Sequence, residues 1–160
     1  MSLACSAFPA GKTISVEHVY KPVAGGSVGG VLIAEYRKTS AEYFEEYAKR
    51  YCIDAAFLNA FDKAYAVRES AAKAKGDEYA GVPFTEHWIS YVLKSGANWK
   101  GPIKNFRLVV DKEKPSNFVS FCGDGLKKIT PTRFELRKTN FEPTANLDIL
   151  VVEFFNSEKN

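Results

Sequence analysis

The sequence has no long hydrophobic run. Its longest apolar stretch spans residues 149–152, with Phe154 and Phe155 just beyond Glu153, whereas a membrane-spanning helix needs about 18 or more apolar residues. We therefore expect no membrane span. Residues 1–10 also lack the charged leader and the apolar segment of a secretory signal, so we expect either a cytoplasmic protein or an export signal outside this chain.

The chain also has little excess of either charge. It contains 22 basic and 19 acidic residues, and its formal net charge is +3 at pH 7. Because the two signs are interspersed, no concentrated basic stripe forms, and we expect no nucleic-acid binding. Hydrophobic residues make up 46% and charged residues 26% of the 160 positions, as in ordinary globular proteins. We expect a single β-rich domain over residues 1–160.

Histidine and cysteine are scarce, with two and three copies. Neither type has the spacing of a zinc site, so we predict no metal and no cofactor. His18 and His87 lie in alternating strand patterns, which are typical of ordinary side chains on a strand face. A cysteine-dependent hydrolase with Cys52 or Cys122 as nucleophile and His87 as base stays an alternative. No strand-to-helix elbow surrounds either cysteine, and we assign no catalytic residue.

Glycine is concentrated at one place. Val23 to Gly30 contains the pairs Gly25-Gly26 and Gly29-Gly30, which predicts a mobile loop. The spacing of a phosphate-binding loop is absent, so we assign this segment no phosphate site. A second glycine pair, Gly123 and Gly125 around Asp124, is typical of a hairpin turn rather than of a calcium loop.

What the chain has in abundance is aromatic residues and short alternating segments. Aromatics reach 14% and favour half-buried sheet surfaces. The predicted strands are Thr13 to Lys21, Phe84 to Leu93, Ile103 to Asp111, Asn117 to Cys122, Arg133 to Lys138 and Leu147 to Phe155. Turn signals separate them at intervals of about a dozen residues. We therefore predict an α+β fold: an antiparallel β-sandwich of immunoglobulin-like character.

Two helices are expected to interrupt the strands, as an insertion over about residues 39–76. Thr39 and Glu42 form a capping-box signature ahead of an aromatic stripe that includes Tyr47 and Tyr51. Asp54 can cap a second helix. Its apolar face is Phe57, Leu58, Phe61, Tyr65 and Ala72, and it closes near Lys73, Lys75 and Gly76. We expect this face to pack on the sheet.

Several segments resemble a family of uncharacterised, exported proteobacterial proteins with a domain of unknown function. They are residues 96–111, 119–125 and 130–134, with residues 8–11, 16–22 and 51–54 in addition. The resemblance implies a periplasmic or secreted protein. It also implies that this chain is the carboxyl-terminal part of a longer protein with a signal peptide and a further β-rich portion. A partner at the edge of the first strand is then another protein or that missing amino-terminal part.

The three cysteines differ in their surroundings. Cys5 precedes the first predicted strand, whereas Cys52 follows the aromatic helix and Cys122 ends a strand at a glycine turn. Helix packing on the sheet can bring the last two within the roughly 4.4 to 6.8 Å between α-carbons that a disulfide requires, and an oxidising compartment would preserve the bond. We expect a Cys52–Cys122 disulfide. Two separate buried thiols, or a catalytic cysteine, are the alternatives.

Trp99 and Asn98 lie in a predicted turn, residues 97–101. An exposed indole there would be a binding anchor, but a buried corner residue explains Trp99 without a ligand, and we prefer that expectation. The leading functional hypothesis is a non-catalytic periplasmic or secreted module that acts by structure or protein contact. The alternatives are the cysteine-dependent hydrolase and a carbohydrate- or peptide-binding module that uses Trp99.

Overall fold

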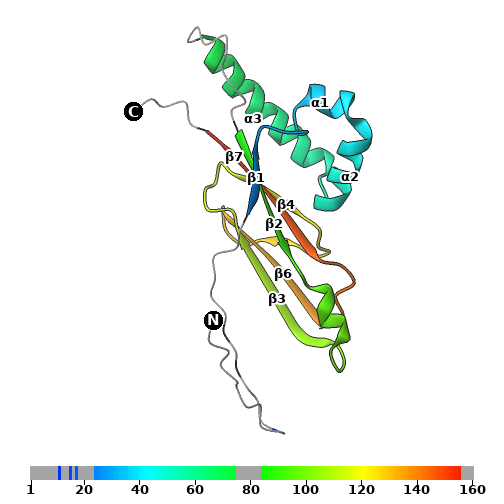
Figure 1. Ribbon diagram of the computed structural model, residues 1–160. Coiled ribbons are helices and arrows are strands. Elements are labelled where there is room, and N and C mark those ends of the chain that lie inside the picture. The colour runs from blue at the N-terminus through cyan, green and yellow to red at the C-terminus, as the bar shows by residue number, and fades with distance from the viewer. Residues whose placement is uncertain (1–10, 12–14, 16, 18–23, 75–83, 156–160) are drawn as a thin grey trace, which may run out of the picture.

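A computed structural model describes residues 11, 15, 17, 24–74 and 84–155 (Figure 1). The predicted strand from Thr13 to Lys21 falls almost wholly outside the described residues, as do Cys5 and His18. No helix in the described part of the chain combines the length and the apolar character needed to cross a membrane.

In the described residues, seven strands form two antiparallel sheets. Sheet A has the order β1-β2-β7-β4, and sheet B has the order β3-β6-β5. The strands of sheet A are β1 (Gly25–Val28), β2 (Phe84–Tyr91), β7 (Leu147–Phe154) and β4 (Phe118–Phe121). The strands of sheet B are β3 (Ile103–Asp111), β6 (Arg133–Phe141) and β5 (Lys127–Lys128). Together with the helices described next, these antiparallel sheets confirm the α+β class.

Helices pack on one face of sheet A and sheet B packs on the other. The helices are α1 (Ala34–Thr39), α2 (Ala41–Tyr51) and α3 (Ala55–Ala74), and a 3-10 helix, η1 (Lys94–Asn98), follows β2. Alternate residues of β7 serve both sides: Leu150 and Val152 join the core under the helices, whereas Ile149 and Val151 face sheet B. Figure 1 shows the three helices beside sheet A, with β3 and β6 farther from them.

The core under the helices is built from aromatic rings. Phe61 of α3 is fully buried, and its ring centroid lies 5.0 Å from that of Phe84 and 5.5 Å from that of Phe154. The aromatic face predicted for this helix therefore packs on sheet A. Asp54 caps the helix as predicted, because its Oδ1 accepts a hydrogen bond of 2.7 Å from the backbone N–H of Phe57. Lys75 and Gly76 lie outside the described residues.

Within the bounds predicted for the helical insertion, the described residues contain α2 and α3, the two helices expected; α1 is an additional helix that precedes them. Thr39 ends α1 instead of capping the next helix, because its hydroxyl donates back to the carbonyls of Glu35 and Tyr36. Ser40 precedes α2 without a side-chain cap. Arg37 holds α1 in place, since its guanidinium donates to the Leu32 carbonyl at 2.9 Å and pairs with Asp62 of α3 at 2.6 Å.

Two predictions about glycine segments are wrong. Gly25–Val28 is the edge strand β1 and not a loop. A Cβ on Gly25 would lie 3.0 Å from the Trp88 ring, so the missing side chain is what allows the strands to pair so closely. The turn around Asp124 is not a hairpin either, because it joins β4 of sheet A to β5 of sheet B. Strand β6 also extends past Lys138 to Phe141.

Candidate functional site

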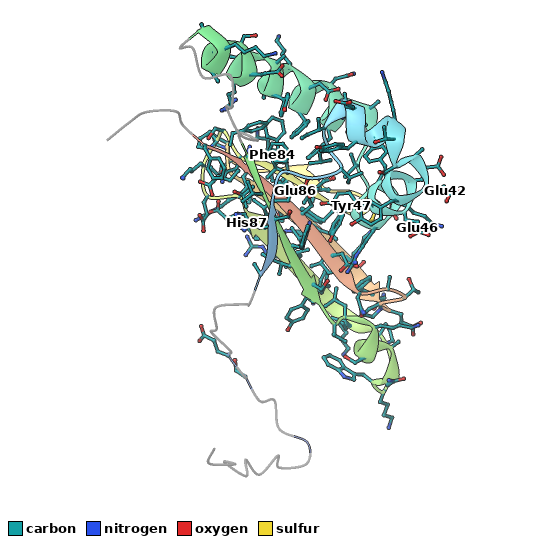
Figure 2. The ribbon with its side chains drawn as sticks, turned by 45° about the horizontal axis from the view of Figure 1, so that its top comes forward. Glu42, Glu46, Tyr47, Phe84, Glu86 and His87 are labelled. Atoms are coloured by element: carbon teal, nitrogen blue, oxygen red, sulfur yellow. A yellow bond between two sulfur atoms is a disulfide. The ribbon has the colours of Figure 1, made fainter. Side chains whose placement is uncertain are left out.

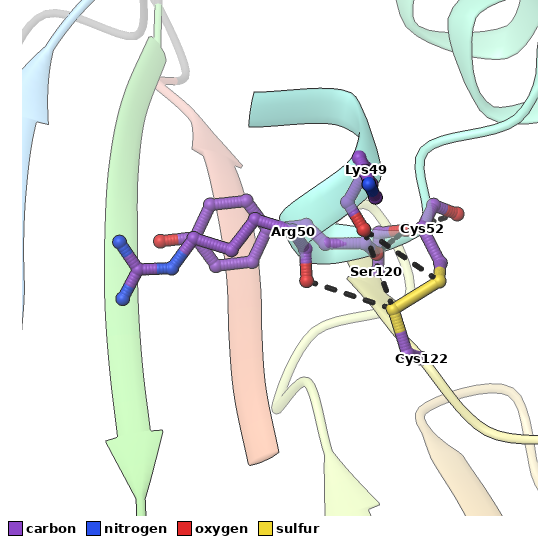
Figure 3. The surroundings of a disulfide bond; sticks show 6 residues. Lys49, Arg50, Cys52, Ser120 and Cys122 are labelled. Atoms are coloured by element: carbon purple, nitrogen blue, oxygen red, sulfur yellow. Dashed lines mark hydrogen bonds between the residues drawn. A yellow bond between two sulfur atoms is a disulfide. The ribbon is translucent and has the colours of Figure 1, made fainter. Parts of the chain in front are cut away.

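A disulfide joins Cys52 to Cys122 and fixes the end of α2 to the end of β4 (Figure 3). The α-carbons lie 5.1 Å apart, within the range that the bond requires. Cys52 adopts a left-handed conformation with φ of 53°, and Ile53 N–H reaches back to the carbonyl of Ala48 at 2.9 Å. This pattern is the Schellman motif, in which a left-handed residue closes a helix.

Side-chain contacts around the bond reinforce the same junction. The hydroxyl of Ser120 on β4 donates to the carbonyls of Tyr51 at 2.9 Å and Cys52 at 3.3 Å. Cys122 Sγ lies 3.6 Å from the carbonyl oxygens of Lys49 and Arg50 (Figure 3). Because a disulfide sulfur has no hydrogen to donate, we interpret these two approaches as packing contacts.

The cysteine-hydrolase alternative needs a free thiolate beside His87. Cys52 and Cys122 are bonded to each other, and the polar contacts of their sulfurs within the described ranges are with backbone carbonyls. His87 lies on β2 and faces sheet B, in register with Val151. The structure therefore does not join His87 to either sulfur by a hydrogen bond. Across residues 24–74 and 84–155, no three His, Cys, Asp or Glu side chains are grouped to hold a metal ion.

Trp99 is exposed, which corrects the preferred expectation of a buried corner residue. Its exposed fraction is 65%. The reason lies in η1, whose buried residue is Gly96: a Cβ there would come within 3.3 Å of Pro143 Cγ. Gly96 thus takes the buried position, and Trp99, with extended backbone at the end of η1, lies outside it.

A groove of about 600 Å³ lies at η1, the 3-10 helix that Trp99 follows in the chain. Asn98 is part of its wall, and so is Val92, which is 65% exposed. The full lining is Val92, Lys94, Ser95, Ala97, Asn98, Glu142, Pro143, Thr144 and Asn146. Of the two residues that the sequence singled out for binding, Asn98 lines this groove and Trp99 follows it in the chain. We refer to the groove with Trp99 and Tyr91, which is 47% exposed, as the tip surface.

A buried carboxyl group that was not predicted from the sequence, that of Glu86 on β2, faces α2 (Figure 2). Glu86 is 1% exposed and accepts a hydrogen bond of 2.6 Å from the Tyr47 hydroxyl, which in turn accepts one of 2.8 Å from Trp88 Nε1. The second oxygen, Glu86 Oε1, has no partner among the described residues. It lies against Gly30, where any side chain would collide with the carboxyl group.

Burial sets the protonation of this group. Desolvation raises the pKa of Glu86, partly offset by the hydrogen bond from Tyr47, because the charged form is disfavoured in a dry site. Desolvation and the neighbouring carboxyl also raise the pKa of Tyr47. The alternation of β2 was the available signal: Glu86 occurs between Phe84 and Trp88 on the face that packs against the helices.

We expect Glu86→Gln to remove a pH dependence of stability. A folded-state pKa above the unfolded one makes the protonated form the stable one, so wild type should lose stability relative to Glu86→Gln as pH rises above about 4.5. One proton limits the slope to about 1.4 kcal/mol per pH unit. Urea denaturation from pH 3.5 to 8 measures the difference. The exposed Glu46→Gln on α2 controls for removing one carboxylate, and parallel curves for wild type and Glu86→Gln would contradict the expectation.

Comparison with known proteins identifies one family. The family model described as "Domain of unknown function (DUF4424)" matches residues 3–150. Searches of curated proteins and of solved structures found no match.

Proposed function

Because this chain belongs to the DUF4424 family, whose description names no activity, we propose its role from its surface. It is a non-catalytic protein-interaction module that contacts its partner through the tip surface. The observation that favours this proposal is Trp99, which is 65% exposed and follows Asn98, a residue that lines a groove. Large aromatic side chains dominate the energetics of protein interfaces. At 65% exposure, Trp99 contributes little to the packing of the core.

The composition of the tip surface supports a protein partner. Val92 and Tyr91 add exposed apolar area to that of Trp99, whereas Lys94, Glu142 and Asn146 supply polar groups at the groove. An apolar anchor with a polar rim is the usual anatomy of an interface between proteins. The surface is also held firmly: the backbone N–H of Lys94 donates to Asn146 Oδ1 at 3.3 Å, and Pro143 is fully buried beneath η1.

We further propose that the protein works in the periplasm or outside the cell. The disulfide between Cys52 and Cys122 favours an oxidising compartment. The chain as the carboxyl-terminal part of a longer exported protein, and the immunoglobulin-like character of its two sheets, remain predictions that accompany this proposal.

The tip surface is tested by site-specific photo-crosslinking in the cells that make the protein. A photoreactive residue at position 99 should form one discrete adduct, whereas the same residue at Val67, 63% exposed on α3, should not. Trp99→Ala should abolish partner binding and change the free energy of unfolding by less than about 0.5 kcal/mol, as for exposed positions generally. Equal labelling at both positions would contradict the proposal, and so would a large loss of stability.

A peptide- or carbohydrate-binding module is the second candidate, because an exposed indole also stacks on sugar rings. It predicts that soluble oligosaccharides or short peptides alone change the fluorescence of Trp99 saturably, with no protein adduct at position 99. The matched control is Trp99→Phe, which removes this fluorescence signal and leaves only that of Trp88.

A further inference from the structure

The buried carboxyl group of Glu86 lies between two parts of the chain that are held differently. On one side it faces α2, through the hydrogen bond from Tyr47 (Figure 2). On the other side its Oε1 lies against Gly30, just past the end of β1. Strand β1 pairs with β2 so that Ser27 is directly opposite Glu86. We call residues 25–30 the β1 segment.

Helix α2 is fixed in place on its side of Glu86. The disulfide between Cys52 and Cys122 joins the end of this helix to β4. The hydroxyl of Ser120 on β4 donates to the carbonyls of Tyr51 and Cys52. Both Tyr47 and Tyr51 are buried in the core under the helices. Helix α2 therefore cannot move away from Glu86 without loss of these contacts.

The β1 segment is held by fewer contacts. Strand β1 has four residues and lies at the edge of sheet A. Two of the four are glycines, and Val28 is 69% exposed. Beyond the strand, the backbone N–H of Gly29 donates to the carbonyl of Phe84 at 3.0 Å, and the buried side chains begin again at Val31 and Leu32. Short edge elements with few buried apolar contacts open at the lowest free energy.

Glu86 also lacks a compensating charge. It forms no ion pair within the described ranges, and its Oε1 has no partner there. Lys112, the other buried charged side chain in the described part of the chain, differs because its ammonium donates to the carbonyls of Pro115 and Asn117. A buried carboxylate with an unpaired oxygen is far less stable than the neutral acid. Access of water to Oε1 would relieve that cost.

The other titratable groups of this core are tyrosines. Tyr47 and Tyr51 lie on α2, and Tyr65 of α3 packs at the margin of the same core. Desolvation raises the pKa of all three above the ordinary value of 10, so they stay neutral at neutral and acidic pH. Val152, opposite Glu86 on β7, has no titratable group, and neither has any side chain of the β1 segment. Glu86 is therefore the group whose charge can change here.

His87 is a second titratable group beside β1, on the other face of β2. It faces sheet B, and a Cβ at Gly26 would lie 3.5 Å from its Nδ1. An imidazole can change charge between pH 5 and 8. A pH dependence of β1 must therefore be assigned with His87 substituted as well as Glu86.

We infer that the protonation of Glu86 controls the pairing of β1 with β2: the neutral carboxyl group keeps the β1 segment closed, whereas loss of its proton opens this segment and leaves α2 in place. Opening lets water reach Oε1, so the charged form is favoured in the open state. The closed state binds the proton more tightly, and opening therefore increases as pH rises. In the open state β2 becomes the edge strand of sheet A.

Amide hydrogen exchange of the full chain, followed by nuclear magnetic resonance, tests this inference. Corrected for the intrinsic exchange rate, it gives an opening constant for each amide. The reporter is the Gly29 N–H, and the reference is the Ile53 N–H, which bonds to the Ala48 carbonyl at the end of α2. We expect the Gly29 constant to rise above about pH 4.5, by at most about tenfold per pH unit, the limit for one proton. The Ile53 constant should stay much smaller. A constant for Gly29 that does not change with pH, or equal constants at the two amides, would overturn the inference.

Variants assign the effect to one residue. Glu86→Gln stays neutral and should make the Gly29 constant independent of pH. The matched controls are the exposed Glu46→Gln on α2 and His87→Gln, which should both keep the dependence of wild type. Persistence of the dependence in Glu86→Gln, or its loss in His87→Gln, would show that Glu86 is not the controlling group.

Tyr47→Phe gives a second test that does not require Glu86→Gln to fold. The hydrogen bond from Tyr47 lowers the pKa of Glu86 and so favours the carboxylate. Without it, the closed state should hold the proton to higher pH, and the rise of the Gly29 constant should extend to higher pH than in wild type. An unchanged profile in Tyr47→Phe would contradict control by the buried carboxyl group.

Discussion

Replacing Phe61 with alanine should lower the free energy of unfolding by about 3 to 5 kcal/mol, the usual cost of removing a buried phenylalanine ring. Phe61 has no exposed surface, and its ring contacts those of Phe84, Phe118 and Phe154 with centroid separations from 5.0 to 6.4 Å. It is thus the residue through which α3 contacts three strands of sheet A, β2, β4 and β7. Neighbouring rings cannot collapse fully into the space, so a cavity adds to the lost burial.

Urea denaturation at neutral pH measures this loss, with Val67→Ala as the matched control on the same helix. Val67 is 63% exposed, so its substitution should change stability by less than about 0.5 kcal/mol. Phe61→Leu should fall between the two, because leucine refills part of the volume. A loss below about 1 kcal/mol for Phe61→Ala would show that this face of α3 is not buried against the sheet.

The helix around Phe61 could be predicted because its signals are local. Asp54 caps it through a hydrogen bond to Phe57, three residues away, and the apolar stripe follows the helical period. The strands of the carboxyl-terminal half were predictable for the same reason, since alternation and turn residues are read within a few positions. Only the ends of these strands differ from the prediction, as in β6, which extends to Phe141.

Long-range contacts explain the elements that could not be predicted correctly from the sequence. Gly25–Val28 is a strand because β2 offers it a register that places Gly25 against Trp88, more than 60 positions away. Likewise α1 is tied to α3 by the ion pair between Arg37 and Asp62, which no local pattern shows. Strand β5 consists of only Lys127 and Lys128, too short for any alternation to be visible.

The candidate sites divide in the same way. The sequence drew attention to Trp99 and Asn98, but whether the indole was buried depended on Gly96 packing against Pro143. Lys112 and Asn117 gave no signal, because their importance comes from burial. For Glu86, the alternation of β2 indicated the buried face and not the unpaired oxygen. A lysine and an asparagine in a polar loop are ordinary until the fold closes over them, and the unpaired oxygens of Asn117 and Glu86 exist only in the packed state.

Removing the disulfide should cost nearly as much as removing Phe61. Cys52 and Cys122 are 70 residues apart, and closing a loop of that length restricts the unfolded chain by about 4 kcal/mol on the chain-entropy model. The bond also holds the end of α2 to β4, next to the hydrogen bonds from Ser120. We expect Cys52→Ala with Cys122→Ala to lower the free energy of unfolding by about that amount, measured by urea denaturation of air-oxidised protein.

Reductant provides the matched control. Dithiothreitol should destabilise wild type to about the level of the double variant and should leave the double variant itself unchanged. Because the hydrogen bonds of Ser120 do not involve the sulfurs, Ser120→Ala should add its own, smaller loss of about 1 kcal/mol in both backgrounds. A larger loss in the double variant would mean that the bond and the hydroxyl support the junction together.

The bond itself is tested by peptide mapping without reductant, on protein that was air-oxidised or exported to the periplasm. Proteolysis should release one cross-linked pair containing Cys52 and Cys122, with Cys5 recovered as a free thiol. Protein made in a reducing cytoplasm is unsuitable, because the pair can stay reduced there. Recovery of Cys52 and Cys122 as free thiols from oxidised protein would show that the disulfide does not form. It would also remove the main support for a periplasmic or secreted location, since that proposal depends on an oxidising compartment.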